Sequence, residues 1–568
     1  MLNDKLEKEE IKRQLHSIKN AGLGAVIIRT FNGLETDYLG EEWMSILKTI
    51  TETAKKVGLK VYFQAGYMPS AIPELQLPEK YRYTALWYME KDNNSSNQDK
   101  DIIKTDEDYI YYEKKYNKVV DLLNPSAIKY YLKKAYKDIY LEDFEKEFGE
   151  TVTAIWVDEP HFKPPSLPWG DKLKNSFKNK WNYALEDNII SLFQNKGNYQ
   201  LIRYHYWQTV VEMLKKGYFE PVSKWSERHN VKFSGHLMGE DNLVSQIGFT
   251  GAAMPLYEKM HIPGIDHLTL SLTWGHGDNA GIDHEKFIMT PKQASSVAHQ
   301  LGKEEILAEM YGVSTEGITF SDRKWIWNWF SVLGINHKCL HGSFYSLRGR
   351  RKRIYPPHLS YQQPWWQYND RFADYTSRIS QALRKGKFKA EALVIHPVES
   401  SFCVFDPINT DVRNYPESPA PIRDLNKSLV KVSENLMKIH CSYDYGDESL
   451  LENYGEIEAD KLKMGEMSYK VVILPSIKTL RKSTISLLEK FIEKGGKVIA
   501  VGNLPTRING RKDTEILEFN KKLISINNTK ESLKSVVKSL ISKEFQLEGV
   551  KGNTDNIWLQ ERELDNKK

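Results

Sequence analysis

Carboxylate side chains that close apolar runs are the residues of this sequence best suited to acid–base chemistry. Asp158 and Glu159 follow Val152–Val157, and Glu309 follows Ile306–Ala308. A neutral carboxylic acid can protonate a leaving oxygen while an ionised partner acts as nucleophile or base, and such a pair is the working unit of glycosidic-bond hydrolysis. Burial at one site can push the two pKa values apart. The sequence therefore predicts a carboxylate pair, in which Glu159 is the general acid and Glu309 the nucleophile or general base.

The choice of Glu159 over its neighbour rests on strand geometry. Alternation puts Asp158 and Glu159 on opposite faces, so only one should point toward the site, and glutamate reaches further. The alternatives are structural roles. Asp158 and Glu159 could cap a helix or form a salt bridge, and Glu309 could be a surface residue. Glu316, seven residues after Glu309, competes with it for the same role.

Other polar and aromatic residues are candidates for substrate binding. His236 could donate to a sugar hydroxyl or to a catalytic carboxylate, although a lone histidine is often structural. His236 and Glu240 could also ligate a metal, but nothing completes a ligand set, so no metal site is predicted. For the aromatic substrate-binding candidates, the alternative is packing in the protein core. The substrate-binding candidates are Asp158, His236, Glu240, Trp274, Tyr311, His341 and Trp365.

The elements that must position these residues alternate between helix and strand. A first helix with Leu6, Ile11, Leu15 and Ile18 on one stripe, capped by Asn3 or Asp4, precedes an apolar strand, and Gly58 ends a second helix before the next strand. This alternation is typical of α/β proteins with parallel strands, whose active sites lie after the carboxyl ends of the strands. The seven predicted strands are 25–28, 59–63, 152–157, 231–233, 265–270, 306–310 and 332–340.

Seven strands are one fewer than a (β/α)8 TIM-type barrel needs, and the chain opens on a helix, so the missing strand should be the first. We therefore predict an α/β fold in which residues 1–385 form a barrel that lacks its first strand. A flavodoxin-like doubly wound domain follows at 386–545, and residues 546–568 begin a β-rich segment that is cut short. The polar stretch Lys91–Asp108 is predicted to be an insertion in a loop.

Composition excludes several functional classes. The 568 residues carry 80 basic and 75 acidic side chains, a net charge of +5, which favours neither nucleic acid nor an anionic membrane as partner. No apolar stretch is long enough to span a membrane. Three scattered cysteines argue against a disulfide scaffold. The charged amino-terminal segment lacks the apolar core of a secretory signal, which favours a cytoplasmic location.

The sequence resembles glycoside hydrolase family 106, the α-L-rhamnosidases, and its relatives. The resemblance runs through AVIIRTFNGLETDYLGEEW, WVDEPHF, SGHLMGED, MHIPGIDHL, AEMYG, FSDRKWIWNWFSVLGIN and HGSFYSLRGRRKRIYPPHLSYQQPWW, over about residues 1–545. It implies a clan-A-like barrel followed by a flavodoxin-like domain. Clan A places its acid/base and nucleophile at the ends of strands four and seven, which matches Glu159 and Glu309. Relatives carry an aromatic strand before Asn3, of which this chain has only Leu2-Asn3-Asp4.

The resemblance implies removal of a terminal sugar, with L-rhamnose as the candidate. Family 106 inverts configuration and is associated with calcium, whereas clan A retains configuration, so both outcomes stay open, and calcium is implied by resemblance alone. Flavodoxin-like domains beside such barrels often mediate assembly, which implies a homo-oligomer. The alternatives are a retaining β-galactosidase-like enzyme and a truncated, catalytically silent carbohydrate-binding or assembly subunit. Nucleotide binding is disfavoured because the second domain lacks phosphate-cradling glycines.

Overall fold

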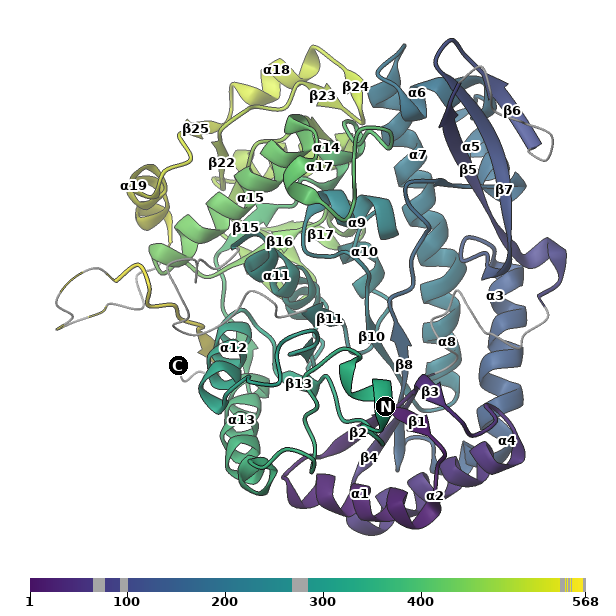
Figure 1. The fold of residues 1–568 in the computed structure, drawn as a ribbon. Coiled ribbons are helices and arrows are strands. Elements are labelled where there is room, and N and C mark those ends of the chain that lie inside the picture. Colours follow the sequence, from purple (N-terminus) through teal and green to yellow (C-terminus); the bar gives the residue numbers. More distant parts are fainter. Residues whose placement is uncertain are drawn as a thin grey trace.

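The computed structural model describes residues 1–64, 77–91, 101–267, 284–541, 547, 549, 552 and 554–564, without the side chains of 284–287. The chain adopts a mixed α/β fold in which helices surround parallel strands (Figure 1). Among the described residues, no helix has both the length and the apolar character needed to cross a membrane.

Parallel strands near the middle of the molecule carry the candidate site. Four of them form one sheet in the order β10-β8-β4-β2, and three form another in the order β11-β12-β13. A parallel bridge between Ser234 and Ile262 links the two sheets beside β10. The strands are β2 (Ala25–Ile28), β4 (Lys60–Gln64), β8 (Val152–Asp158), β10 (Lys232–His236), β11 (Gly264–His267), β12 (Leu307–Met310) and β13 (His337–Leu340).

All seven predicted strands are present, with changes at their ends. Strand β10 continues to His236, so that this residue ends the strand rather than following it. The prediction for 332–340 was too long, because α12 (Phe320–Val332) ends at Val332 and β13 begins at His337. Residues 268–270 of the fifth predicted strand lie outside the described residues.

The first helix begins later than predicted. Helix α1 (Lys8–Asn20) has Glu7 as its N-cap, whereas Asn3 and Asp4 belong to β1 (Leu2–Asp4). Strand β1 pairs in parallel with β3 (Thr30–Leu34), and the Leu2 amide donates to the Arg29 carbonyl at 2.8 Å. The cap prediction was wrong because residues 2–4 gain tertiary strand pairing that the local sequence does not reveal.

Helices cover the outer side of these strands (Figure 1). Helix α2 (Glu41–Val57) ends as predicted, with Gly58 in the left-handed conformation that glycine adopts without strain. Two of the longer helical stretches contain π-helical turns, at Leu132–Leu141 and Lys215–Phe219. The other covering helices are α3 (Pro125–Tyr131), α7 (Tyr199–Leu214), α8 (Glu220–Arg228), α9 (Leu243–Thr250), α11 (His284–Gln300) and α13 (Asn369–Arg384).

An antiparallel sheet stands where a polar loop was predicted. Strand β6 (Asp101–Thr105) lies inside Lys91–Asp108 and pairs with β7 (Tyr109–Val120), so that part of the prediction was wrong. The sheet has the order β6-β7-β5-β9, with β5 (Arg82–Glu90) and β9 (Leu167–Trp169) as its other members. Residues 92–100 lie outside the described residues.

A second parallel sheet follows α13. Its order is β16-β15-β20-β22-β25, and β15 (Ala392–Ile395), β20 (Val471–Leu474) and β22 (Lys497–Val501) are buried apolar runs. Separate small sheets in this part of the chain contain β17 (Gly455–Glu458), β18 (Lys461–Met464) and β19 (Met467–Tyr469); β21 (Thr479–Leu480), β23 (Arg507–Ile508) and β24 (Arg511–Lys512); and β14 (Lys387–Phe388) with β26 (Arg562–Glu563). The remaining elements are α14 (Val398–Phe402), α15 (Ala420–Lys438), β16 (Tyr443–Gly446), α16 (Glu448–Tyr454), α17 (Lys482–Glu493), α18 (Glu515–Asn520), β25 (Ile524–Ile526) and α19 (Lys530–Leu540).

The two parts of the chain share a buried polar contact. Asp444 on β16 is fully buried and meets His299 and Lys292 of α11 at 2.9 and 3.4 Å. Tyr469 donates a further hydrogen bond to the same carboxylate at 3.1 Å. This cluster fixes the second sheet against α11.

Candidate active site

Acidic and histidine side chains meet at the carboxyl ends of the central strands. Parallel pairing sets His236 opposite Asp158 and Asp266 opposite Glu309. Because neighbouring parallel strands end at the same edge, residues far apart in the sequence converge there. Glu159, the residue directly after β8, joins this group.

His236 lies at the centre of the group. Its Nε2 is 3.0 Å from Oε2 of Glu309 and 3.4 Å from Oδ1 of Asp158. A nitrogen of the same ring lies within 4.8 Å of carboxylate oxygens of Glu159 and Asp266. The side chain of His236 is 1% exposed, so its contacts with these acids are shielded from water. Two roles were predicted for His236, and the structure contains the contact that one of them requires, with the candidate catalytic carboxylate of Glu309.

The two predicted carboxylates have opposite pKa shifts. The pKa of Glu159 is raised to about 7: burial is the largest cause, the His236 charge opposes it, and the Asp158 and Glu309 charges add to the rise. Burial also acts to raise the pKa of Glu309, but the hydrogen bond and charge of His236, together with His341 and Arg29, outweigh it and hold the pKa at about 2. Between these values Glu159 is protonated and Glu309 is ionised, as an acid and its ionised partner must be.

His236 is held in its charged form by its acidic neighbours. Burial acts to lower the pKa of His236, but the Glu309 hydrogen bond and the Asp266, Glu309 and Asp158 charges raise it well above its ordinary value. A charged imidazole among carboxylates is the expected state of such a buried cluster, because either charge alone would be costly to bury.

Asp158 and Glu159 both face this cluster, which corrects the prediction that only one of them would. Glu159 has a backbone φ of 49°, in the left-handed region, so the alternation of an extended strand ends before it. Asp158 forms an ion pair with Arg29 at 2.6 Å, while its other oxygen faces His236. Such backbone strain in a non-glycine residue is often found at functional sites.

Two members of the cluster, Asp266 and Arg29, were missed by the sequence analysis. Burial, more than the neighbouring charges, raises the pKa of Asp266 well above its ordinary value. The sequence analysis did not select Asp266 because the predicted strand continued past it to residue 270, so this residue did not lie at a predicted strand end. Arg29 directly follows β2, and its position after an apolar strand was the available signal.

Glu240 supports the cluster from behind. Its carboxylate accepts the hydroxyl of Tyr257 and, at 2.8 Å, the backbone amide of Asp266. It is 2% exposed, and burial raises its pKa to about 8. Both oxygens are therefore engaged by the protein, and Glu240 fixes the strand end that carries Asp266.

The other predicted binding residues are dispersed. His341 lies beside the cluster, with Nε2 4.0 Å from Oε1 of Glu309. Tyr311 is fully buried and donates to the Arg323 carbonyl at 3.1 Å. The ring of Trp365 packs against Phe320 and under the Arg323 guanidinium. Trp274 lies outside the described residues.

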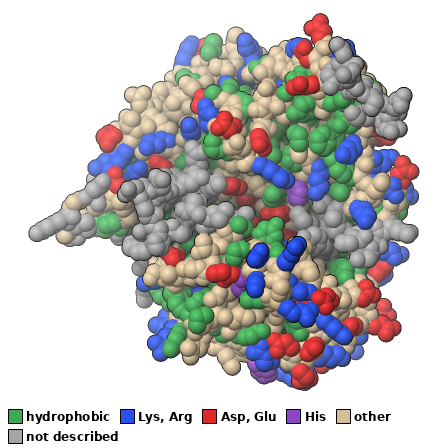
Figure 2. Space-filling view, in the orientation of Figure 1, with side chains coloured by type: hydrophobic (Ala, Val, Ile, Leu, Met, Phe, Trp, Pro, Cys, Tyr) green, Lys and Arg blue, Asp and Glu red, His purple; other side chains and the backbone are tan. Residues whose placement is uncertain are grey.

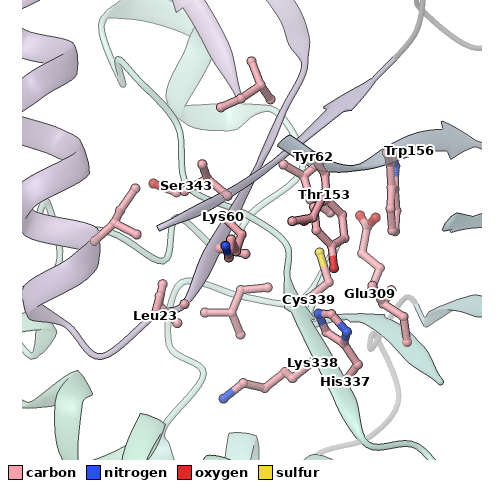
Figure 3. Close-up of a pocket in the computed structure, with 18 of the residues that line it drawn as sticks. Leu23, Lys60, Tyr62, Thr153, Trp156, Glu309, His337, Lys338, Cys339 and Ser343 are labelled. Atoms are coloured by element: carbon pink, nitrogen blue, oxygen red, sulfur yellow. The ribbon is translucent and has the colours of Figure 1, made fainter. Parts of the chain in front are cut away.

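A cavity of about 910 Å³, lined in part by Glu309, lies between β2 and β13. Figure 3 shows Glu309 beside Trp156 on its wall, with Tyr62 and Cys339 from neighbouring strands close by. Residues of α1 and α13, among them Leu15 and Ala373, line its outer side. Strand β1 lies near the carboxyl ends of the strands that border this cavity, where the Met1 carbonyl accepts a hydrogen bond from the Tyr345 amide at 3.0 Å.

The cluster does not fit calcium. The described residues whose ligand atoms lie within 4.8 Å of one another are Glu159, His236 and Asp266, which offer two carboxylates and one imidazole. Calcium takes six to eight oxygen ligands. Because His236 also bonds Glu309 through Nε2, the set is better explained as an acid–imidazole network than as a calcium site.

Two buried carboxyl groups at strand ends have pKa values shifted in opposite directions, which is the arrangement expected of a glycoside hydrolase. Comparison with known proteins also identifies a glycoside hydrolase family. The family model of glycoside hydrolase family 106, described as alpha-L-rhamnosidase, matches residues 117–557. The chain belongs to this family. A search of curated proteins found no match.

Solved structures similar to this chain are also glycosidases. A rhamnosidase from Novosphingobium sp. PP1Y superposes with a TM-score of 0.68 at 12% identity, covering 95% of this chain and 72% of that one. A β-galactosidase from Bacillus circulans sp. alkalophilus gives 0.57 at 12% identity, covering 90% and 72%. A catalytic mutant of a family 42 β-galactosidase from G. stearothermophilus gives 0.56 at 10% identity, covering 90% and 73%. At these identities the likeness concerns the fold.

Proposed function

We propose that this glycoside hydrolase removes a terminal sugar, with α-L-rhamnose as the first candidate, by a two-carboxylate mechanism. The observation that carries the proposal is the opposite shift of two buried carboxyl groups, with the pKa of Glu159 near 7 and that of Glu309 near 2. The family membership and the structural likeness to a rhamnosidase support the choice of sugar.

In this mechanism Glu159 is the general acid. Its protonated carboxyl donates to the glycosidic oxygen as the bond to the anomeric carbon breaks. Glu309 remains ionised on the other side of the reacting carbon, where it attacks directly or activates a water. Its Oε2 is held by His236, which leaves Oε1, 4.0 Å from Nε2 of His341, as the oxygen for that role.

Several neighbours act through these two carboxylates. The Asp158 charge raises the pKa of Glu159, and Arg29, which pairs with Asp158, partly opposes this rise. The hydrogen bond to Glu309 and the charges of the neighbouring carboxylates raise the pKa of His236, so this hydrogen bond persists across the working pH range. Tyr311 and Trp365 are proposed to support the walls of the sugar subsite, and Trp274 to contact the sugar.

The architecture is interpreted in the same proposal. The seven parallel strands with β1 correspond to a (β/α)8 barrel whose wall is open between β2 and β13. The order of the second sheet, in which the second strand in the chain lies outside the first and the third to fifth follow, is typical of flavodoxin-like domains.

Hydrolysis of a panel of aryl glycosides tests the proposal. The panel contains α-L-rhamnoside and β-D-galactoside and is run with added calcium and with EDTA. We expect wild-type protein to release aglycone from the rhamnoside, and Glu159→Gln and Glu309→Gln each to reduce kcat/KM by about a hundredfold or more. Glu316→Gln is the matched control, since Glu316 bonds His358 and Gln363 instead of the cluster.

Each result has a defined meaning. Full activity in either cluster variant would refute the assignment of that carboxylate. Hydrolysis of the galactoside alone would favour the β-galactosidase-like alternative, and well-folded protein that hydrolyses nothing would favour a silent carbohydrate-binding subunit. The anomer released first, observed by NMR, decides whether Glu309 acts as nucleophile (retention) or as base (inversion).

A further inference from the structure

The backbone of the candidate acid is held by the imidazole of His161. Nδ1 of this ring is 2.6 Å from the carbonyl oxygen of Glu159, two residues earlier in the chain. Glu159 has a φ of 49°, in the left-handed region that glycine adopts without strain. A glutamate stays in this region only where its surroundings hold it there. The His161 contact is therefore placed to hold the turn that directs the Glu159 side chain.

The two polar contacts of the His161 ring define its protonation state. A carbonyl oxygen only accepts hydrogen bonds, so Nδ1 must carry a proton toward Glu159. An ammonium group only donates, so Nε2, which is 3.4 Å from Nζ of Lys163, must be unprotonated. Together these contacts require the neutral imidazole with its proton on Nδ1. The pKa of His161 agrees with this state, because burial and, after it, the Lys163 charge lower it to about 4.

A phenylalanine ring fixes the orientation of this imidazole. Phe249 of α9 meets the His161 ring edge-on, with the ring centroids 5.7 Å apart and the planes at 87°. The Phe249 carbonyl also accepts the amide of Phe162 at 2.8 Å. The same ring packs tightly on the loop after β10, where a Cβ on Gly239 would lie only 2.5 Å from it. Phe249 therefore joins the loop that carries the acid to the loop that follows His236.

The position of the Glu159 carboxyl determines whether it is protonated near neutral pH. Figure 2 shows acidic and histidine side chains near the middle of the visible face, with Lys and Arg side chains around them. If the carboxyl turned away from the cluster into water, it would lose the burial that is the largest cause of its raised pKa, and its pKa would fall toward the ordinary value of 4.5. The charged groups around this carboxyl are Asp158, His236, Asp266, Glu309 and Arg29.

From these contacts we infer that His161 is the positioning residue of the general acid. Its Nδ1–H group, bonded to the Glu159 carbonyl, holds the left-handed turn, and the turn keeps the Glu159 carboxyl inside the cluster. The inference rests on the proposed function for the role of Glu159 as acid. It goes beyond that function by assigning a residue that acts on the backbone of the acid, and by defining the one tautomer in which it acts.

Two variants of similar size separate the hydrogen bond from packing. In His161→Asn the amide nitrogen takes the place of Nδ1 and can donate to the same carbonyl, whereas in His161→Leu a methyl group stands there. The control is His205→Leu, which removes another buried histidine whose pKa is lowered to about 4 but whose ring contacts Trp181 and Tyr183 instead.

The substrates are phenyl and 2,4-dinitrophenyl glycosides of the sugar that the panel identifies. Phenoxide needs a proton to leave and dinitrophenoxide does not, so only the first substrate reports on the general acid. We expect His161→Leu to reduce kcat/KM for the phenyl glycoside about tenfold or more, mainly through kcat, and for the dinitrophenyl glycoside less than about threefold. Both rates should stay close to the wild-type values in His161→Asn and in the control.

Two spectroscopic measurements need no hydrolysis and so separate failure of this inference from failure of the proposed function. Nitrogen-15 NMR of the wild-type imidazoles, with the His161 signals identified by their loss in His161→Asn, should show the neutral Nδ1–H tautomer at neutral pH. Infrared titration of the carboxyl groups, with Glu159 identified by Glu159→Gln, should give a pKa near 7 in the wild type and in His161→Asn, and a lower pKa in His161→Leu.

These pKa values would support the positioning role even if no glycoside is hydrolysed. An imidazolium or an Nε2–H tautomer of His161 at neutral pH would overturn it, and this result is obtained on wild-type protein even if His161→Leu does not fold. It would also be overturned by an unchanged Glu159 pKa in folded His161→Leu, or by equal losses in His161→Asn and His161→Leu.

Discussion

Replacement of His236 by glutamine should move both limbs of the pH–rate profile upward. In the wild type, the pKa of Glu309 falls from its ordinary value of 4.5 to about 2. At about 1.4 kcal/mol per tenfold change, this amounts to a preference of about 3 kcal/mol for the ionised form. The His236 hydrogen bond and charge are the largest contributions that oppose burial. Without them, burial acts with less opposition, and we expect the pKa of Glu309 to reach its ordinary value or exceed it.

The measurable consequence is a loss of activity in acid. With a pKa near 2 almost all Glu309 is ionised at about pH 3.5, whereas with a pKa of 4.5 about one tenth is, so kcat/KM relative to its plateau should fall about tenfold in the variant. The alkaline limb should also move upward from about pH 7, because the His236 charge lowers the pKa of Glu159. The profile of kcat/KM on an aryl glycoside reports both limbs.

In this experiment, acid unfolding has to be distinguished from a loss of catalytic activity. The lowered pKa of Glu309 contributes stability above about pH 4.5 that is lost as the pH falls toward 2, so circular dichroism must confirm the fold at each pH. His337→Gln is the control, because His337 bonds Glu305 at the opposite end of the strands. An acid limb that stays in place in His236→Gln would refute the role given to this imidazole.

Three further outcomes follow from the same contacts. Asp158→Asn should lower the pKa of Glu159 and move the alkaline limb of the rate profile to lower pH, since the Asp158 charge raises that pKa; an unchanged limb would contradict it. Glu240→Leu should lower the free energy of unfolding in urea by about 1–3 kcal/mol, because it removes the acceptor of the Asp266 amide. Asp444→Asn should cost about 3–5 kcal/mol by the same measurement, since it leaves buried basic groups without their counter-ion; a loss below about 1 kcal/mol would refute this reading.

Local sequence was sufficient to locate the strand ends of the site. Apolar runs bounded by glycine or proline identify β2, β8 and β12, and the position after such a run led to Glu159 and Glu309. The pattern could not reveal that Glu159 leaves the extended conformation, because a positive φ at a glutamate has no sequence signature. The same limit explains why Asp158 was assigned to the opposite face.

Contacts between distant segments were harder to predict. The pairing of β1 with β3 and the sheet formed by β5, β6, β7 and β9 depend on partners far along the chain. Strands β5 and β7 mix tyrosines and charged residues with apolar ones, so they lack the continuous apolar character by which the buried parallel strands were recognised. Arg29 was missed for a related reason, since its importance comes from Asp158, on another strand.

The difference between the two carboxylates comes from one imidazole. Burial acts in the same direction on both, raising the pKa of Glu159 and opposing the low pKa of Glu309. His236 donates a 3.0 Å hydrogen bond to Glu309, whereas it influences Glu159 only through its charge. Glu309, which the imidazole bonds, is therefore the ionised carboxylate, and Glu159 remains the protonated acid. His236, at the end of β10, is the main cause of this division of roles, and the Asp158 charge beside Glu159 and the His341 charge beside Glu309 act in the same sense.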